Sequence, residues 1–141
     1  MSKTRVVRRH IVRGMPKDIY PILKYRDAHA AIDWLERAFG FERISVHDGP
    51  DGTVAHAELR HGEGVVMLGS QGVGDDGGFG DRTGQAWLYV VVEDADAHHA
   101  QATAAGAQIY RELEDQDYGS RDFSARDLEG NLWSFGTYGP E

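Results

Sequence analysis

His56 and Glu58 lie two residues apart in the segment HAELR, and their types and spacing suit acid–base chemistry. Successive residues of a β-strand point to opposite faces, so residues two apart share one face. On a strand, this imidazole and this carboxylate would orient one another for proton transfer, or supply two ligands of a metal ion. The plainer alternative is a hydrogen-bonded pair in the wall of a pocket.

A hairpin is expected to place this pair beside a second strand. The loop HGEG at residues 61–64 is rich in turn formers and separates two strand-like segments. If the two strands pair directly across this loop, Glu58 lies opposite Met67 and His56 lies opposite Gly69, on the same face. Met67 is therefore expected next to the histidine and the glutamate.

A second feature is the hydroxyl of Ser134 in the apolar segment LWSFG, which follows the turn DLEG. Strand alternation puts Trp133 and Phe135 on one face and Ser134 on the other. If the aromatic face packs into the core, Ser134 points into whatever space the sheet encloses.

The order of strands and helices around these residues repeats along the chain. From Asp27 to Gly40 is 13 positions, and from Glu93 to Gly106 is also 13. Each of these segments reads as a helix with a strand before it and three strands after it, which predicts an internal βαβββ duplication. The expected helices are residues 27–39 and 94–105, and the expected strands are residues 20–24, 42–48, 53–60, 65–69, 87–92, 109–113, 123–127 and 132–138.

The length of 141 residues fits one compact unit rather than two independent domains. The predicted fold class is α+β. We divide the chain into a basic N-terminal arm (1–18), a first βαβββ module (19–70), a glycine-rich linker (71–86) and a second βαβββ module (87–141).

Charge and composition narrow the classes of partner. Residues 1–17 carry six of the 15 basic side chains and no acidic one, which leaves the rest of the chain with a formal charge of −14. Such an acidic body repels polyphosphate, so nucleic-acid binding is not expected. No apolar run approaches the roughly 18 residues of a membrane span. The absence of cysteine suits a cytoplasmic protein and excludes thiolate metal sites.

Four segments in this order resemble the vicinal oxygen chelate superfamily, also called the glyoxalase/bleomycin-resistance/dioxygenase group. They are LKYRDAHAAIDWLERAFGF, HAELRHGEGVVMLG, VVVEDADAHHAQATAAGAQI and YGSRDFSARDLEGNLWSFG. The resemblance runs from about Ile19 to Tyr138. It implies two βαβββ modules whose curved mixed sheets surround a cleft, in a homodimer.

The resemblance also implies where a metal would be held. Metalloenzymes of the superfamily place a His or Glu ligand on the first and the last strand of each module, and the matching positions here are Tyr20, Met67, Trp87 and Ser134. A phenol, a thioether, an indole and a neutral hydroxyl do not replace imidazole and carboxylate as ligands of a divalent metal. We therefore expect no metal centre and no cofactor, which puts glyoxalase or ring-cleaving dioxygenase activity in doubt.

The same positions suit a flat organic ligand, because aromatic faces and a thioether stack well on planar rings. The expected function is the binding of a small aromatic or planar molecule, as in drug sequestration. The expected binding residues are Tyr20, His56, Glu58, Met67, Trp87, Tyr89 and Ser134. One alternative is a lyase, isomerase or dioxygenase-like enzyme that uses His56 and Glu58, with or without a divalent metal. Another is an interaction module whose cleft is filled by its own side chains.

Other polar residues are expected to have structural roles. His98 and His99 are predicted to face solvent, opposite a stripe of alanines at Ala97, Ala100 and Ala104. Arg121 and Arg126 are expected to pair with Asp122 and Asp127, or else with an anionic ligand.

Overall fold

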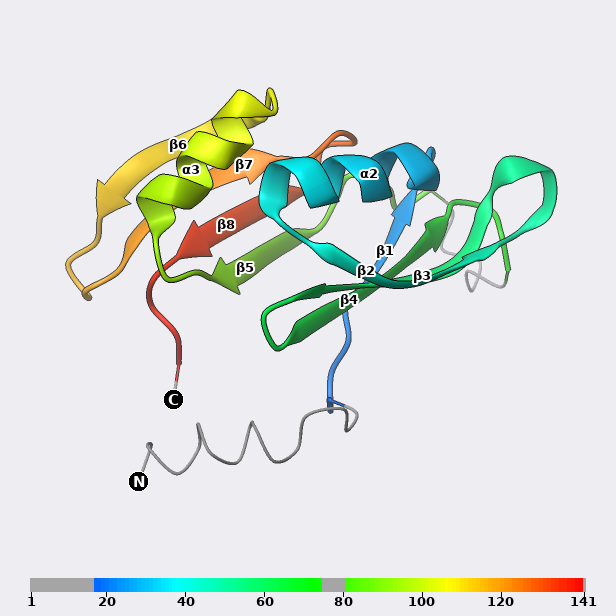
Figure 1. The fold of residues 1–141 in the computed structure, drawn as a ribbon, viewed down its shortest axis with the longest axis horizontal. Coiled ribbons are helices and arrows are strands. Elements are labelled where there is room, and N and C mark those ends of the chain that lie inside the picture. Colours follow the sequence, from blue (N-terminus) through cyan, green and yellow to red (C-terminus); the bar gives the residue numbers. More distant parts are fainter. Residues whose placement is uncertain (1–16, 75–80, 141) are drawn as a thin grey trace.

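The computed structural model describes residues 17–74 and 81–140, and within them the chain forms two modules side by side (Figure 1). The elements of the first module are β1 (Ile22–Tyr25), α2 (Ala28–Phe39), β2 (Glu42–Asp48), a 3-10 turn (Pro50–Gly52), β3 (Val54–His61) and β4 (Gly64–Ser70). Those of the second are β5 (Trp87–Val91), α3 (Ala95–Ala104), β6 (Gln108–Asp115), β7 (Arg121–Arg126) and β8 (Leu132–Gly136).

Each module contributes one four-stranded mixed sheet. The strand order is β1-β4-β3-β2 in the first sheet and β5-β8-β7-β6 in the second. In both sheets the first and last strands of the module run parallel, and the remaining pairs are antiparallel. The predicted α+β fold of two βαβββ modules is therefore confirmed.

The two ends of α2 are set by capping residues, Asp27 at the N-terminus and Gly40 at the C-terminus. The Asp27 side chain accepts a hydrogen bond from the Ala30 amide, which satisfies a donor that the first helical turn leaves free. Gly40 ends the helix in the left-handed conformation, with a φ of 78° that only glycine adopts without cost. Asp94 caps α3 in the same way, through the Ala97 amide.

The buried face of α3 differs from the prediction. The residues that it buries are Ala95 and Ala102, and the predicted alanine stripe of Ala97, Ala100 and Ala104 is exposed. His98 and His99, predicted to face solvent, are instead both half-buried. A helix of alanine, histidine and other small or polar residues has no clear apolar stripe, so its orientation depends on what it packs against.

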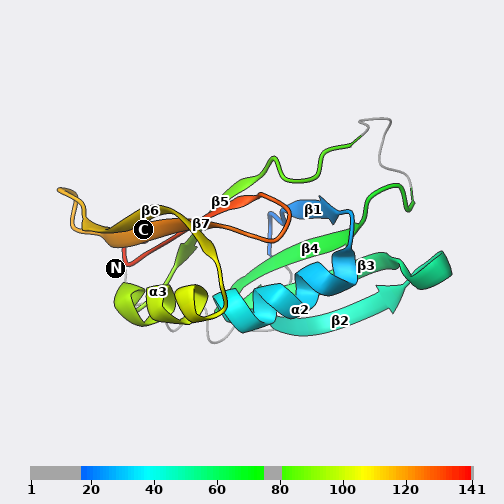
Figure 2. The ribbon, with the colours of Figure 1, turned by 90° about the horizontal axis from the view of Figure 1, so that it is seen from above.

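One core joins the two modules. The ring of Phe39, at the end of α2, lies 4.7 Å from that of Phe135 and 5.8 Å from that of Trp133, both on β8. Both helices lie on the same side of the two sheets and run end to end (Figure 2). Among residues 17–74 and 81–140, no helix lies over the opposite side of either sheet, and we call these two surfaces the open faces.

The β7–β8 turn of the second module is hydrogen-bonded to the segment between β1 and α2 of the first module. The Glu129 carboxylate accepts hydrogen bonds from the backbone amides of Arg26 and Asp27, at 2.6 and 2.7 Å. The neighbouring Asp127 carboxylate is buried and accepts from the Tyr25 hydroxyl at 2.6 Å and from the Trp133 indole at 3.0 Å. These bonds fix the two modules relative to one another at the β1–α2 corner.

The first strand differs from the predicted strand of residues 20–24. β1 begins at Ile22, so Tyr20 precedes the strand, and its hydroxyl accepts a hydrogen bond from the Lys17 amide at 2.7 Å. Most of the predicted N-terminal arm and residues 75–80 of the predicted linker lie outside the described residues. In the described part of the chain, neither helix is long and apolar enough to cross a membrane.

Candidate functional site

Aromatic side chains of β5 are exposed on the open face of the second sheet. On β5 the burial alternates, with Trp87 and Tyr89 exposed and Leu88 and Val90 turned toward the core. β5 pairs with β8 so that Tyr89 lies directly opposite Ser134. Trp133 and Phe135 point into the core, so Ser134 faces outward with the β5 aromatics, as the strand pattern predicts.

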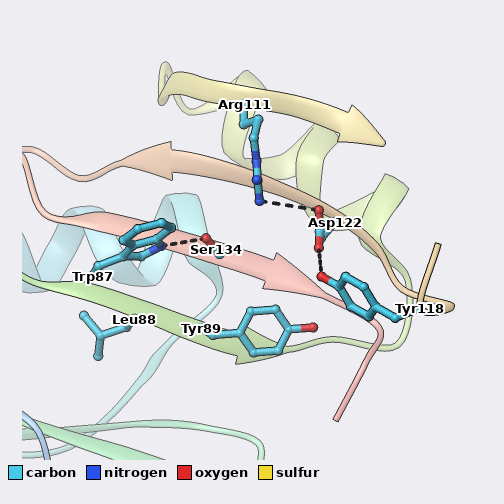
Figure 3. A pocket seen from close by; sticks show the side chains of 7 residues that line it. All are labelled: Trp87, Leu88, Tyr89, Arg111, Tyr118, Asp122 and Ser134. Carbon is cyan, nitrogen blue, oxygen red and sulfur yellow. Dashed lines mark hydrogen bonds and ion pairs between the residues drawn. The ribbon is translucent and has the colours of Figure 1, made fainter. Parts of the chain in front are cut away.

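A pocket of about 290 Å³ lies over this face. It is lined by Trp87, Leu88, Tyr89, Arg111, Tyr118, Asp122 and Ser134 (Figure 3). Its walls thus combine three aromatic rings, one guanidinium and one carboxylate.

The indole of Trp87 is held in place by a short hydrogen-bonded chain. Its Nε1–H donates to the Ser134 hydroxyl at 2.9 Å, and that hydroxyl lies 2.7 Å from the hydroxyl of Ser124 on β7. The hydroxyl of Ser134 within an apolar strand thus has a partner, because it accepts a hydrogen bond from the indole N–H. Trp87 as a whole residue is 67% exposed even so, which leaves its ring available for stacking.

Asp122 forms a buried polar centre beside the aromatic rings. Its side chain is 3% exposed and accepts hydrogen bonds from the side-chain amide of Gln116 at 3.0 Å and from the Tyr118 hydroxyl at 3.2 Å. Arg111 Nη2 lies 3.8 Å from its Oδ1, beyond hydrogen-bond distance. Desolvation and the Asp122 charge raise the pKa of Tyr118, so the phenol stays protonated and donates.

Gly136 makes room for these groups. A Cβ atom at this position would lie 2.5 Å from the Tyr89 hydroxyl and 2.8 Å from the Asp122 Cβ. The Tyr89 hydroxyl passes over the glycine and donates to the Tyr138 carbonyl at 2.7 Å. The absence of a side chain at position 136 therefore lets Tyr89 lie flat against the sheet.

The predicted acid–base pair lies on the open face of the first sheet. Glu58 is paired with Met67, as predicted, and His56 Nε2 lies 2.9 Å from Glu58 Oε2. The β3–β4 ladder ends at Ala57 and Leu68, so the predicted pairing of His56 with Gly69 is not part of it. The His47 ring stacks 6.3 Å from that of His56.

The predicted binding residues therefore separate into two groups. Trp87, Tyr89 and Ser134 come together in the pocket of the second sheet. His56, Glu58 and Met67 lie on the first sheet, and Tyr20 lies outside β1. The pocket residues that the sequence analysis did not identify as ligand-binding are Leu88, Arg111, Tyr118 and Asp122.

Arg121 and Arg126 do not have the predicted partners. Arg121 pairs with Asp96 at 3.0 Å and Asp115 at 3.2 Å, which raises its pKa. Arg126 donates to the Gly130 carbonyl at 3.2 Å and its guanidinium lies 5.0 Å from the ring centre of Tyr110. Neither of these two arginines is among the residues that line the pocket, whereas Arg111 is.

The donor set at the four inferred ligand positions does not fit a divalent metal. The Trp87 nitrogen carries a proton that it donates to Ser134, and the Tyr20 hydroxyl is bonded to the Lys17 amide. Within residues 17–74 and 81–140, no three His, Cys, Asp or Glu side chains are grouped so that they could hold a metal ion.

Comparison of the chain with known proteins identifies its family and several relatives. A protein family described as the Glyoxalase/Bleomycin resistance protein/Dioxygenase superfamily matches residues 20–135. The chain is 31% identical to the uncharacterized protein Rv0887c of Mycobacterium tuberculosis over 147 aligned positions, covering 96% of this chain and 86% of the relative. It is 34% identical to the uncharacterized protein Mb0911c of Mycobacterium bovis, covering 82% of this chain and 80% of the relative.

Solved structures show the same fold. The crystal structure of TioX from Micromonospora sp. ML1 superimposes with a TM-score of 0.75 at 36% identity, covering 86% of this chain and 98% of TioX. A glyoxalase I mutant from Zea mays gives a TM-score of 0.66 at 20% identity, covering 86% of this chain and 45% of the maize enzyme.

Proposed function

The chain belongs to the glyoxalase/bleomycin resistance protein/dioxygenase superfamily, and we propose that it binds a small planar aromatic molecule in the pocket of its second sheet. The single observation that carries this proposal is the Trp87 ring. Its polar edge is hydrogen-bonded to Ser134 while its faces stay largely exposed within the pocket. Such a ring loses little freedom when a ligand stacks on it.

The other aromatic residues support the same ligand. The rings of Tyr89 and Tyr118 stand in the pocket wall across from Trp87 and Ser134 (Figure 3). Both hydroxyls are already bonded, to the Tyr138 carbonyl and the Asp122 carboxylate. The two phenols therefore act through their rings. An aromatic pair adds about 0.5–1.5 kcal/mol beyond area burial, so stacking on Trp87 favours a flat ligand over an extended aliphatic one.

Sequestration without a reaction fits this pocket better than catalysis. The Asp122 carboxylate is buried and already accepts two hydrogen bonds, and the described residues that line the pocket include no histidine. A general acid or base must reach the proton that it transfers, at about 2.6–3.2 Å. The pocket thus offers shape and stacking, which suits a protein that lowers the free concentration of a drug-like compound.

We further propose that the working form is a homodimer. The open faces expose large apolar side chains, including Ile22 at 64% on β1 and Val91 at 51% on β5. Val91 shares the open face of β5 with Trp87 and Tyr89, so exposed apolar side chains adjoin one another there, as they do at interaction sites. A second copy that covers these faces would bury the apolar residues and deepen the pocket over Trp87.

Calorimetric titration with 2-naphthamide, an uncharged planar probe, tests the binding proposal. We expect Trp87→Ala to weaken binding by about tenfold, because a stacked ring of this kind contributes on the order of 1 kcal/mol plus its buried area. Trp87→Phe should keep most of the affinity. Tyr110→Ala, which removes an exposed ring that does not line the pocket, is the matched control. Equal affinity of the wild type and Trp87→Ala would overturn the proposal.

A second candidate function rests on the contact between His56 Nε2 and Glu58 Oε2 at 2.9 Å. Both side chains are partly exposed on the first sheet, so a substrate or a metal ion can reach them. Elemental analysis of protein purified without chelators tests this alternative. Stoichiometric metal that is lost in His56→Ala would support a lyase, isomerase or dioxygenase-like enzyme. Metal-free protein that binds 2-naphthamide would leave the binding function as the better account.

A further inference from the structure

We propose that the planar ligand carries hydrogen-bond acceptor oxygens, such as a ring carbonyl, an amide or a carboxylate, and that Arg111 recognises them. This inference rests on the proposed binding function and adds the chemical class of the ligand. It follows from which hydrogen-bonding groups of the pocket are already used and which are free.

The donors of the pocket, apart from Arg111, are occupied by protein acceptors. The Trp87 indole donates to Ser134, the Tyr118 hydroxyl to Asp122 and the Tyr89 hydroxyl to the Tyr138 carbonyl. The Ser134 hydroxyl is also within hydrogen-bond distance of Ser124. A ligand oxygen would therefore have to break an existing bond to gain a partner from any of these groups.

Arg111 is different, because its guanidinium has five N–H donors and makes no hydrogen bond within the described residues. Its nearest charged partner is the Asp122 carboxylate, at 3.8 Å. The side chain is 48% exposed and extends from β6 toward the pocket (Figure 3). Its free N–H groups are thus available to a ligand that stacks on Trp87.

Asp122 positions this arginine. The carboxylate is buried and is held by Gln116 and Tyr118, so its charge stays fixed beneath the guanidinium. At 3.8 Å the attraction orients Arg111 without using up its donors. A planar guanidinium held in this way matches a carboxylate or a pair of carbonyl oxygens in two-point geometry.

The same arrangement disfavours a cationic ligand. An ammonium group would meet the positive charge of Arg111, and the Asp122 oxygens that could accept from it are buried and bonded. The acceptors left in the pocket are phenol and serine hydroxyl oxygens, which are weak partners for a cation. The pocket therefore selects acceptor-bearing over donor-bearing rings.

Three naphthalenes with the same ring area test the inference by calorimetry at pH 7.5. These are 2-naphthamide, 2-naphthoate and 2-(aminomethyl)naphthalene, which present a neutral acceptor, an anionic acceptor and an ammonium donor. We expect the wild type to bind the two acceptor-bearing probes at least about tenfold more tightly than the ammonium probe, as charge-assisted hydrogen bonds contribute about 1.5–3 kcal/mol. Arg111→Met should remove this preference, and Arg111→Lys should keep part of it.

Arg60→Met is the control, because it removes the same charge from an equally exposed arginine on β3, outside the pocket. It should leave the preference unchanged. If no naphthalene binds the wild type, the proposed binding function itself fails. If all three bind and the ammonium probe is equal or tighter, the binding function stands and the role of Arg111 is overturned. The wild-type comparison needs no variant, so it decides the matter even if Arg111→Met folds poorly.

Discussion

The Tyr25 hydroxyl donates a hydrogen bond of 2.6 Å to Asp127 Oδ2, which links β1 of the first module to the β7–β8 turn of the second. The two residues are 102 positions apart in the sequence. Burial and the Asp127 charge raise the pKa of Tyr25 well above its ordinary value. The phenol therefore stays protonated at a pH where an ordinary tyrosine would ionise, and it keeps donating to the Asp127 carboxylate.

We expect Asp127→Asn to destabilise the protein by about 2–4 kcal/mol, because an amide would present donors to groups that now donate to a buried carboxylate. The Oδ2 atom accepts from the Tyr25 hydroxyl and the Trp133 indole, and Oδ1 accepts from two backbone amides. Urea unfolding measures the effect. Asp117→Asn, at an exposed position of the β6–β7 turn, is the control, and equal stability of the two variants would contradict this account.

We expect stability to fall as the pH drops from about 7.5 to 5, in part through two histidines. Burial lowers the pKa of His61 and His98, whose rings lie 5.3 Å apart between the modules. His98 Nε2 donates to the Phe39 carbonyl at 2.9 Å. Because the folded pKa lies below the unfolded value of about 6.5, the unfolded chain binds more protons in this window, and stability is lost as pH falls.

Urea unfolding at several pH values checks this dependence. His98→Gln, which keeps a donor for the Phe39 carbonyl, should flatten the slope of unfolding free energy against pH. His47→Gln, at an exposed position, should keep the wild-type slope. A slope unchanged by His98→Gln would show that other groups cause the loss.

We expect Gly136→Ala to damage the pocket more than the fold. The added methyl group would lie within 3 Å of the Tyr89 hydroxyl and the Asp122 Cβ, so both must shift. Such overpacking costs about 1–3 kcal/mol. Affinity for 2-naphthamide should fall by about tenfold, and thermal unfolding should show that the variant still folds. Gly52→Ala is the control for a general effect of replacing glycine by alanine. A Cβ atom at this position meets no atom within 4 Å, and the positive φ adds backbone strain without crowding.

We expect Ile22→Lys to weaken the proposed dimer. A lysine on the open face of β1 would bring a charge into an apolar interface, where burial without a partner costs several kcal/mol. Sedimentation velocity over a range of concentrations should show a shift toward the monomer. Leu128→Lys, a comparable change at an exposed position of the β7–β8 turn, should sediment as the wild type does. A monomeric wild type would refute the dimer itself.

The duplicated fold is readable from the sequence because its signals are local. The helix caps at Asp27 and Asp94 follow from residue type, and the pairing of Glu58 with Met67 follows from loop length. The face of α3 is not readable in this way, because alanine fits both a buried and an exposed position. His98 is half-buried through contacts with Phe39 and Phe135, which are remote in the sequence.

Arg111 illustrates why part of the candidate site was missed. Simple alternation along β6 would put Arg111 on the same face as Ile109, which packs against the core. The register between β6 and β7 shifts between these two residues, so Arg111 pairs with Ser124 and reaches the pocket. An irregularity of this kind moves a side chain to the other face of the sheet, and it cannot be recognised from the types of the neighbouring residues.

Both helices and the aromatic core lie on one side of the sheets, so the side chains on the open faces take little part in the hydrophobic core. In the proposed site, an exchange at a position such as Trp87 or Arg111 would alter recognition and leave the packing beneath it intact. Stability and specificity are thus encoded in separate layers of side chains. A lineage built on this scaffold can acquire new ligands in a few steps without first losing its ability to fold.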